Sequence, residues 1–150
     1  MSNNFFILIA SDSENQFGKR LTADEVIRQR ILNKQWEIYE RTKFKDILKK
    51  GDICLFYVAG KKTNAQHFIG EGIVKNLHLR PIKPINYVNS ESPQKYIEFE
   101  NVITYEHPID VKTKLDKLSF IPENRTKWGI VFMNGCRKIS KTDYASLKED

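Results

Sequence analysis

An apolar segment near the middle of the chain constrains the fold more than any other feature. Ile53 to Ala59 is an almost unbroken apolar run. A strand with one face in water would alternate, so we expect both faces of this strand to be covered. Gly60 to Gln66 has turn composition, and His67 to Val74 is predicted to return as a second strand. Gly70 and Gly72 share one face of it, which indicates a bend or a close approach of another group.

We take this hairpin as the centre of a small curved sheet, and the rest of the chain supplies its neighbours. Apolar runs predict further strands at 5–10 and 128–133, and apolar alternation predicts strands at 35–42 and 96–105. A capping box at Thr22 and Glu25 begins a helix over 23–33. Thr42 to Lys50 is interpreted as a short amphipathic helix, and Ser140 as the cap of a C-terminal helix. The segment 75–94 contains three prolines and is predicted to be an extended connection, and a helical turn is expected within 111–120.

The length and composition of the chain favour a single domain over residues 1–150. Hydrophobic residues make up 40% and charged residues 29%, as in soluble globular proteins. No apolar run approaches the roughly 20 residues that span a bilayer, and the start of the chain has neither a basic leader nor a cleavage site, so we expect a cytoplasmic protein without a membrane partner. Cys54 and Cys136 are expected to be reduced core thiols.

The charge balance makes nucleic acid the first partner to test. The chain has 25 Lys and Arg against 19 Asp and Glu, a formal net charge of +6. A positive surface attracts polyanions, although many lysine-rich proteins bind none. Six lysines flank the central hairpin and are predicted to contact phosphate, with a merely solvated surface as the alternative for each: Lys43, Lys45, Lys49, Lys50, Lys61 and Lys62.

Sequence motifs for catalysis are missing. The chain has no Gly-rich phosphate loop, no GxSxG and no HExxH. Its three histidines lack metal-ligand spacing among themselves and with the cysteines. We therefore expect no metal, no cofactor and no enzyme, although a catalytic set that assembles only in space stays open.

Two further features have both a structural and a functional interpretation. The polar loop from Ser11 to Asn15 follows the first strand. It is either a solvated turn or a polar rim that fixes ligand groups. Trp36 follows the first helix and is either a core aromatic or the wall of a binding site.

Taken together, four pieces of the chain resemble the EVE domain family, small members of the PUA-like superfamily related to YTH and ASCH domains. The pieces are FFILIASDSEN at the first strand; Trp36 after the first helix; a basic segment followed by Gly51-Asp52, Phe56-Tyr57 and FIGEG at 68–72; and Lys127-Trp128, Phe132, Gly135, Arg137 and Asp143-Tyr144 at the C-terminal end. They occur in the family's order over nearly the whole chain.

The resemblance implies an α+β fold, a PUA-like strongly bent or closed β-barrel of about five to six strands with helices packed outside. It also implies a pocket for a base, often modified, flipped out of DNA or RNA. Aromatic walls would hold the ring and its added apolar group, and polar groups would read its edge. The pocket residues carried over are Ser11, Asn15, Trp36, Tyr39, Lys127 and Trp128.

A base-binding module is therefore the leading hypothesis. The second is an ASCH-like enzyme acting on a modified nucleoside or on RNA. The third is a PUA-like module that binds RNA through shape and phosphate, without a base pocket.

Overall fold

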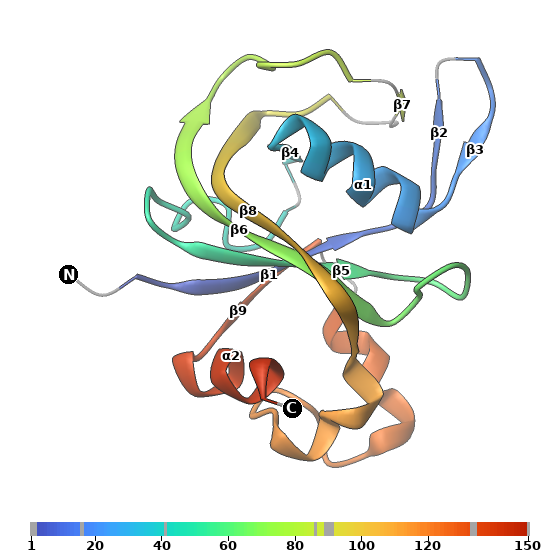
Figure 1. Ribbon diagram of the computed structural model, residues 1–150, viewed down its shortest axis with the longest axis vertical. Coiled ribbons are helices and arrows are strands. Elements are labelled where there is room, and N and C mark those ends of the chain that lie inside the picture. Colours follow the sequence, from blue (N-terminus) through green and yellow to red (C-terminus); the bar gives the residue numbers. More distant parts are fainter. Residues whose placement is uncertain are drawn as a thin grey trace.

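A strongly bent, mixed six-stranded sheet forms the centre of the molecule (Figure 1). The computed structural model describes residues 3–15, 17–40, 42–85, 87–88, 92–132 and 135–149. The strand order is β4-β8-β6-β5-β1-β9. Their bounds are Phe5–Ala10 for β1, Gln35–Ile38 for β4, Ile53–Val58 for β5, His67–His78 for β6, Lys95–Asp110 for β8 and Cys136–Ile139 for β9. The sheet curls into a half-barrel with helices outside, which confirms the predicted α+β fold class.

The predicted central hairpin lies inside this sheet. β5 pairs with β6 antiparallel and with β1 parallel, and β1 also pairs antiparallel with β9. From Cys54 to Val58 every residue of β5 is buried. The unbroken apolar run therefore reflects a strand with protein on both faces, as predicted.

The bend is concentrated where β6 passes over β8. The pairing of these two strands is interrupted by register shifts after Phe68, Glu71 and Val74. A Cβ atom at Gly70 would lie 2.5 Å from the carbonyl oxygen of Ile103, and one at Gly72 would lie 3.2 Å from the Phe99 ring. The prediction of a close approach at the two glycines is thus confirmed.

A second, smaller sheet stands at the end of β1. It has the order β3-β2-β7. β2 spans Ser13–Asn15, β3 spans Arg20–Leu21 and β7 spans Tyr87–Val88. Part of the predicted polar loop is therefore a short hairpin, β2–β3, with a third strand along its other edge.

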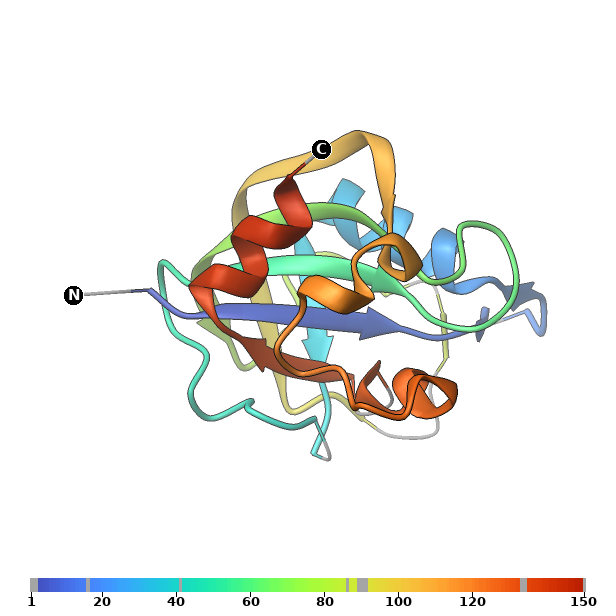
Figure 2. The same ribbon diagram turned by 90° about the horizontal axis from the view of Figure 1, so that it is seen from below.

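Two α-helices cover opposite faces of the large sheet (Figure 2). α1, Ala23–Asn33, has the predicted bounds and capping box. It packs through Val26 and Ile27 on a core cluster that includes Phe56. α2, Lys141–Lys148, begins at the predicted cap Ser140 and packs through Leu147 in the other cluster. Three 3₁₀ segments accompany α2: η1 over Val111–Thr113, η2 over Leu115–Lys117 and η3 over Arg125–Phe132.

Two element predictions are wrong. The segment 42–50 consists largely of turns. Of its three residues predicted to face inward, Leu48 is buried, whereas Phe44 and Ile47 are 39% and 43% exposed. The buried Asp52 carboxylate accepts the Lys49 backbone N–H at 2.9 Å, and Phe44 has a positive φ of 62°, so the backbone cannot continue as a helix. The predicted strand at 128–133 is 3₁₀ up to Phe132, with Met133 outside the described residues.

The cysteines behave as predicted. Cys54 and Cys136 are free and buried. Burial raises the pKa of both thiols, that of Cys136 to about 12, so both stay protonated at neutral pH. Among the described residues, no helix combines the length and apolarity needed to cross a membrane.

Candidate functional site

A cavity of about 170 Å³ opens at the carboxyl end of β1, beside α1. Its apolar lining comes from Ile9, Ala10 and Val26, and its polar lining from Ser11, Asp12, Ser13, Arg30 and Tyr39. An apolar cavity of about 150 Å³ holds one benzene molecule. The space at β1 is therefore large enough for a single planar ring.

The charged wall of the cavity is Arg30, which is only 8% exposed. Arg30 lies on the buried face of α1, with Val26 one turn before it. Its Nε donates to the buried Glu37 carboxylate of β4 at 2.9 Å, and its guanidinium carbon lies 4.2 Å from the centre of the Trp36 ring. The carboxylate and the indole hold the guanidinium plane in one orientation.

At the rim, Asp12 connects three segments. Its carboxylate accepts the Ala23 backbone N–H at 2.9 Å and pairs with Lys62 of the β5–β6 loop at 3.1 Å. Partial burial alone would raise the Asp12 pKa, but Lys62, the Ala23 N–H and the nearby Arg20 outweigh it and lower the pKa. Asp12 is therefore ionised at neutral pH, and two cations surround it.

Trp36 is a core residue in this structure. It is 3% exposed and stacks on Phe56, with ring centres 5.3 Å apart and planes 17° apart. Arg30 covers the indole within 4.2 Å of its ring centre. Trp36 is not among the residues that line the cavity at Ser11.

Trp128 lies on the other side of the sheet. It is half-buried on η3, edge-on to Phe132 at 6.0 Å, in the cluster that also contains Leu147. Trp36 belongs to the cluster under α1. Neither tryptophan is therefore among the described residues that line the cavity at Ser11, contrary to the prediction.

The other predicted pocket residues divide in the same way. Ser11 and Tyr39 meet in the cavity. Asn15 does not line the cavity. Its Oδ1 accepts the backbone N–H groups of Phe17 and Lys19, each at 2.9 Å, so Asn15 stabilises a turn, which is the structural alternative given for this loop. Lys127 is exposed on η3.

The two charged residues of the lining, Arg30 and Asp12, were not among the predicted pocket residues, although Asp12 belongs to the loop considered as a polar rim. Arg30 had a usable signal: it occupies an inward position of an otherwise apolar helix face. A cation there must have a buried partner or a ligand. Asp12 had none, because a loop aspartate commonly bonds its own backbone.

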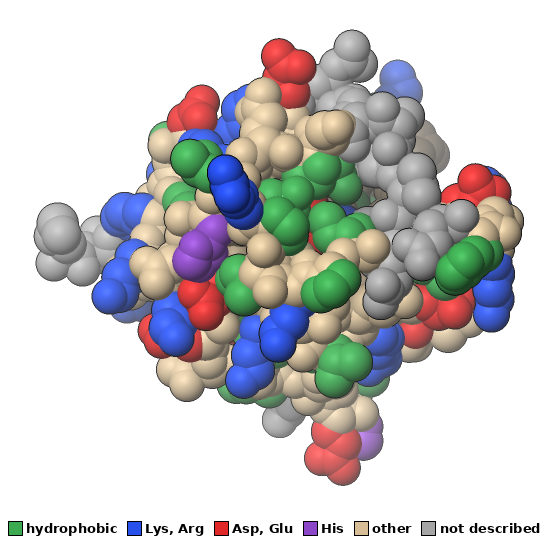
Figure 3. All heavy atoms as spheres, turned by 90° about the horizontal axis from the view of Figure 1, so that it is seen from above, with side chains coloured by type: hydrophobic (Ala, Val, Ile, Leu, Met, Phe, Trp, Pro, Cys, Tyr) green, Lys and Arg blue, Asp and Glu red, His purple; other side chains and the backbone are tan. Residues whose placement is uncertain are grey.

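The six predicted phosphate-binding lysines do not form one patch. Lys43, Lys45, Lys49 and Lys50 precede β5, whereas Lys61 and Lys62 lie in the loop that follows it, so the two groups are at opposite ends of the strand. Lys49 pairs with Asp52 at 2.7 Å, and the Lys45 ammonium donates to Gln94 Oε1 at 2.9 Å. Seen from above, basic side chains are scattered among acidic ones (Figure 3). Of the six, Lys62 reaches the cavity rim through its ion pair with Asp12, and Lys61 precedes it in the chain.

Comparison with family models and with curated proteins finds no match for this chain. Among the described residues, no group of three or more His, Cys, Asp or Glu side chains is arranged to hold a metal ion.

Proposed function

We propose that this protein binds nucleic acid and holds one base, in a modified form as the EVE resemblance implies, in the cavity at the end of β1. The observation that carries the proposal is the buried Arg30 guanidinium in the wall of a ring-sized cavity with hydroxyl groups around it.

The cavity has the chemistry that a base requires. A methylated base presents an apolar group, for which Ile9, Ala10 and Val26 supply a surface. Its ring edge carries donors and acceptors, which the hydroxyls of Ser11 and Tyr39 can meet. Arg30 adds a planar cation with several N–H donors, a group suited to ring nitrogens and carbonyl oxygens.

The charge of the chain supports the same partner. The net charge is +6. Lys62 and Arg20 act on the Asp12 carboxylate, so two cationic side chains lie at the rim. A phosphate backbone that delivers a base to this cavity would meet attraction there.

The proposed function can be tested by a substitution that blocks the mouth of the cavity. Ser11 is exposed at the rim, so Ser11→Phe is expected to leave the fold intact and to abolish the preference for a modified base. Tyr39→Phe removes one hydroxyl, and a hydrogen bond worth about 0.5–1.5 kcal/mol corresponds to a roughly two- to tenfold loss of affinity. Fluorescence anisotropy with modified and unmodified DNA and RNA oligonucleotides measures both.

Thr142→Phe is the matched control, because Thr142 is exposed on α2, which packs on the other face of the sheet. It should bind like the wild type. If the wild type and Ser11→Phe bind all oligonucleotides equally, the cavity does not take part in nucleic-acid binding.

A further inference from the structure

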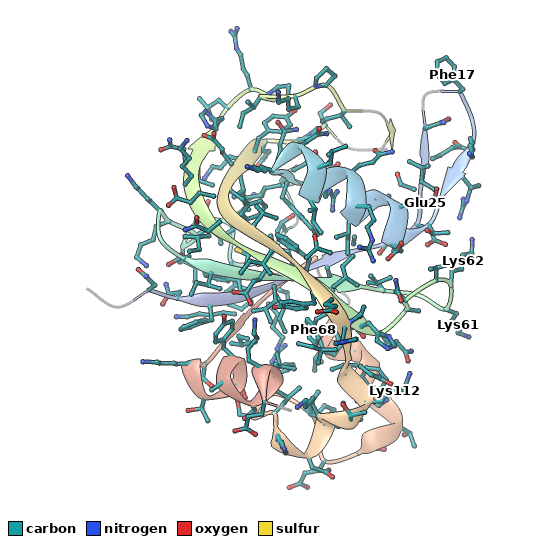
Figure 4. All side chains as sticks on the ribbon, in the orientation of Figure 1. Phe17, Glu25, Lys61, Lys62, Phe68 and Lys112 are labelled. Carbon is teal, nitrogen blue, oxygen red and sulfur yellow. The ribbon has the colours of Figure 1, made fainter. Side chains whose placement is uncertain are left out.

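An exposed aromatic side chain stands at the tip of the β2–β3 hairpin. Phe17 is 83% exposed and is followed by Gly18, with a φ of 83°, and by the exposed cations Lys19 and Arg20. Figure 4 shows Phe17 at the outer end of the hairpin, away from the large sheet.

The hairpin holds this side chain on a defined support. The Asn15 N–H donates to the Lys19 carbonyl oxygen at 2.7 Å, and the Gly18 N–H donates to the Asn15 carbonyl oxygen at 3.1 Å. The Asn15 side chain accepts two more backbone N–H groups in the same turn. β2 is paired on both edges, with β3 and with β7. These hydrogen bonds hold the turn in one conformation, so the exposed aromatic ring can contact another molecule with little further ordering of the backbone.

The same hairpin begins in the cavity wall. Ser13 lines the cavity and is the first residue of β2. A strand rises about 3.3 Å per residue, so β2 spans about 7 Å from Ser13 to Asn15, which is about two base steps of duplex DNA, and Phe17 lies in the turn beyond Asn15. Lys61 and Lys62 project from the β5–β6 loop on the same side of the molecule (Figure 4).

We propose that Phe17 stacks on a base a few nucleotides from the one held in the cavity, while the cations around it contact the intervening phosphates. This inference rests on the proposed function. Aromatic rings on nucleic-acid-binding proteins stack on unpaired bases or enter a base step opened by flipping. The neighbouring Lys19, Arg20, Lys61 and Lys62 supply cations for phosphate contacts, and they are interspersed with the carboxylates of Asp12 and Glu14.

The experiment compares Phe17→Ala with Leu32→Ala. Leu32 is the matched control, an apolar residue 81% exposed on α1. Stacking lost with Phe17 should weaken oligonucleotide binding by roughly five- to a hundredfold. The affinity for the single modified nucleoside should stay unchanged, because a nucleoside in the cavity does not extend to the tip of the hairpin. Leu32→Ala should change neither affinity.

A direct readout comes from Phe17→Trp, whose added indole should be quenched when the oligonucleotide binds but not when the nucleoside does. If wild type binds the oligonucleotide and Phe17→Ala binds it equally, the inference is overturned while the proposed function stands. If wild type binds no oligonucleotide, both are overturned. Loss of binding to anionic phospholipid vesicles in Phe17→Ala, with oligonucleotide affinity unchanged, would overturn the inference in favour of a membrane contact.

Discussion

Single buried carboxylates join distant parts of this chain. Glu37 of β4 holds Arg30 of α1. Glu71 of β6 accepts hydrogen bonds from Tyr105 at 2.7 Å and Tyr144 at 2.8 Å, and pairs with Lys148 of α2. A buried charge is tolerated only when it is paired and hydrogen-bonded. Glu71 therefore fixes α2 on the sheet.

The Glu71 network makes stability depend on pH. Burial alone would raise the Glu71 pKa, but the hydrogen bonds from Lys148, Tyr105 and Tyr144 outweigh it and lower the pKa below the usual 4.5. Because the pKa is lower in the folded state, ionised Glu71 stabilises the protein above pH 4.5. This stabilisation is lost as the pH falls through the pKa of Glu71 in the folded state. Glu71→Gln should cost about 1–3 kcal/mol at pH 7, and its difference from wild type should shrink below pH 4.5.

Urea unfolding at pH 7 and pH 3.5 measures both quantities. Glu106→Gln, an exposed carboxylate on the neighbouring strand, is the control and should be neutral at both pH values. A difference between wild type and Glu71→Gln that stays constant with pH would contradict the ionised network.

At the residue scale, the sequence predicted which polar residues lie at the cavity better than it predicted which residues the aromatic side chains contact. Ser11 and Tyr39 each directly follow a strand, β1 and β4, and both reach the cavity. Trp36 could not be assigned in advance, because its core role depends on Phe56, 20 positions away, and on Arg30. Sequence spacing contains no information on which face of the sheet each tryptophan joins.

Among the elements, β6 depends on glycine for its curvature. The Ile103 carbonyl oxygen would lie 2.5 Å from a Cβ at residue 70, and backbone cannot move aside as a side chain can. Gly70→Ala should therefore destabilise the protein by about 1–3 kcal/mol.

Gly129→Ala is the matched substitution, because no atom of the described residues beyond its chain neighbours lies within 4 Å of its Cβ position. It should change the unfolding free energy little. Thermal melts of the two variants side by side would make the comparison, and equal melting temperatures would mean that β6 and β8 relax around the added methyl group.

Local signals decided which elements were predictable. Both α-helices have capping boxes, which satisfy backbone groups within four residues and so are visible in the sequence. The segment 42–50 has a helical apolar period, but Asp52 binds backbone N–H groups of both Asn4 and Lys49. β9 has the short mixed sequence CRKI and exists because β1 offers it an edge. Tertiary contacts of this kind override local pattern.

At the scale of the whole molecule, the lysines that contribute to the net charge of +6 lie in separate regions. Lys62 pairs with Asp12 at the cavity rim and Lys61 precedes it in the chain, while Lys43 and Lys50 lie beyond the other end of β5. If the proposed function holds, affinity for an oligonucleotide should fall as salt rises, with the logarithmic slope reduced by about 0.7–0.9 for each phosphate contact removed.

Lys61→Ala with Lys62→Ala should therefore lower both the affinity and the salt slope. Lys43→Ala with Lys50→Ala removes the same charge and should leave the slope close to wild type. Titrations at several salt concentrations separate the two double variants. Equal losses in both would indicate attraction by net charge alone, without a located phosphate contact.

The pairing of β1 determines when the large sheet can be completed. β1 is an early segment, yet its two neighbours, β5 and β9, come from the middle and the far end of the chain. During synthesis on the ribosome, the apolar β1 must wait with an unpaired edge until residue 139 has emerged. Such long-range pairing slows folding and exposes an aggregation-prone strand meanwhile. We therefore expect nascent chains that end before β9 to depend on chaperones.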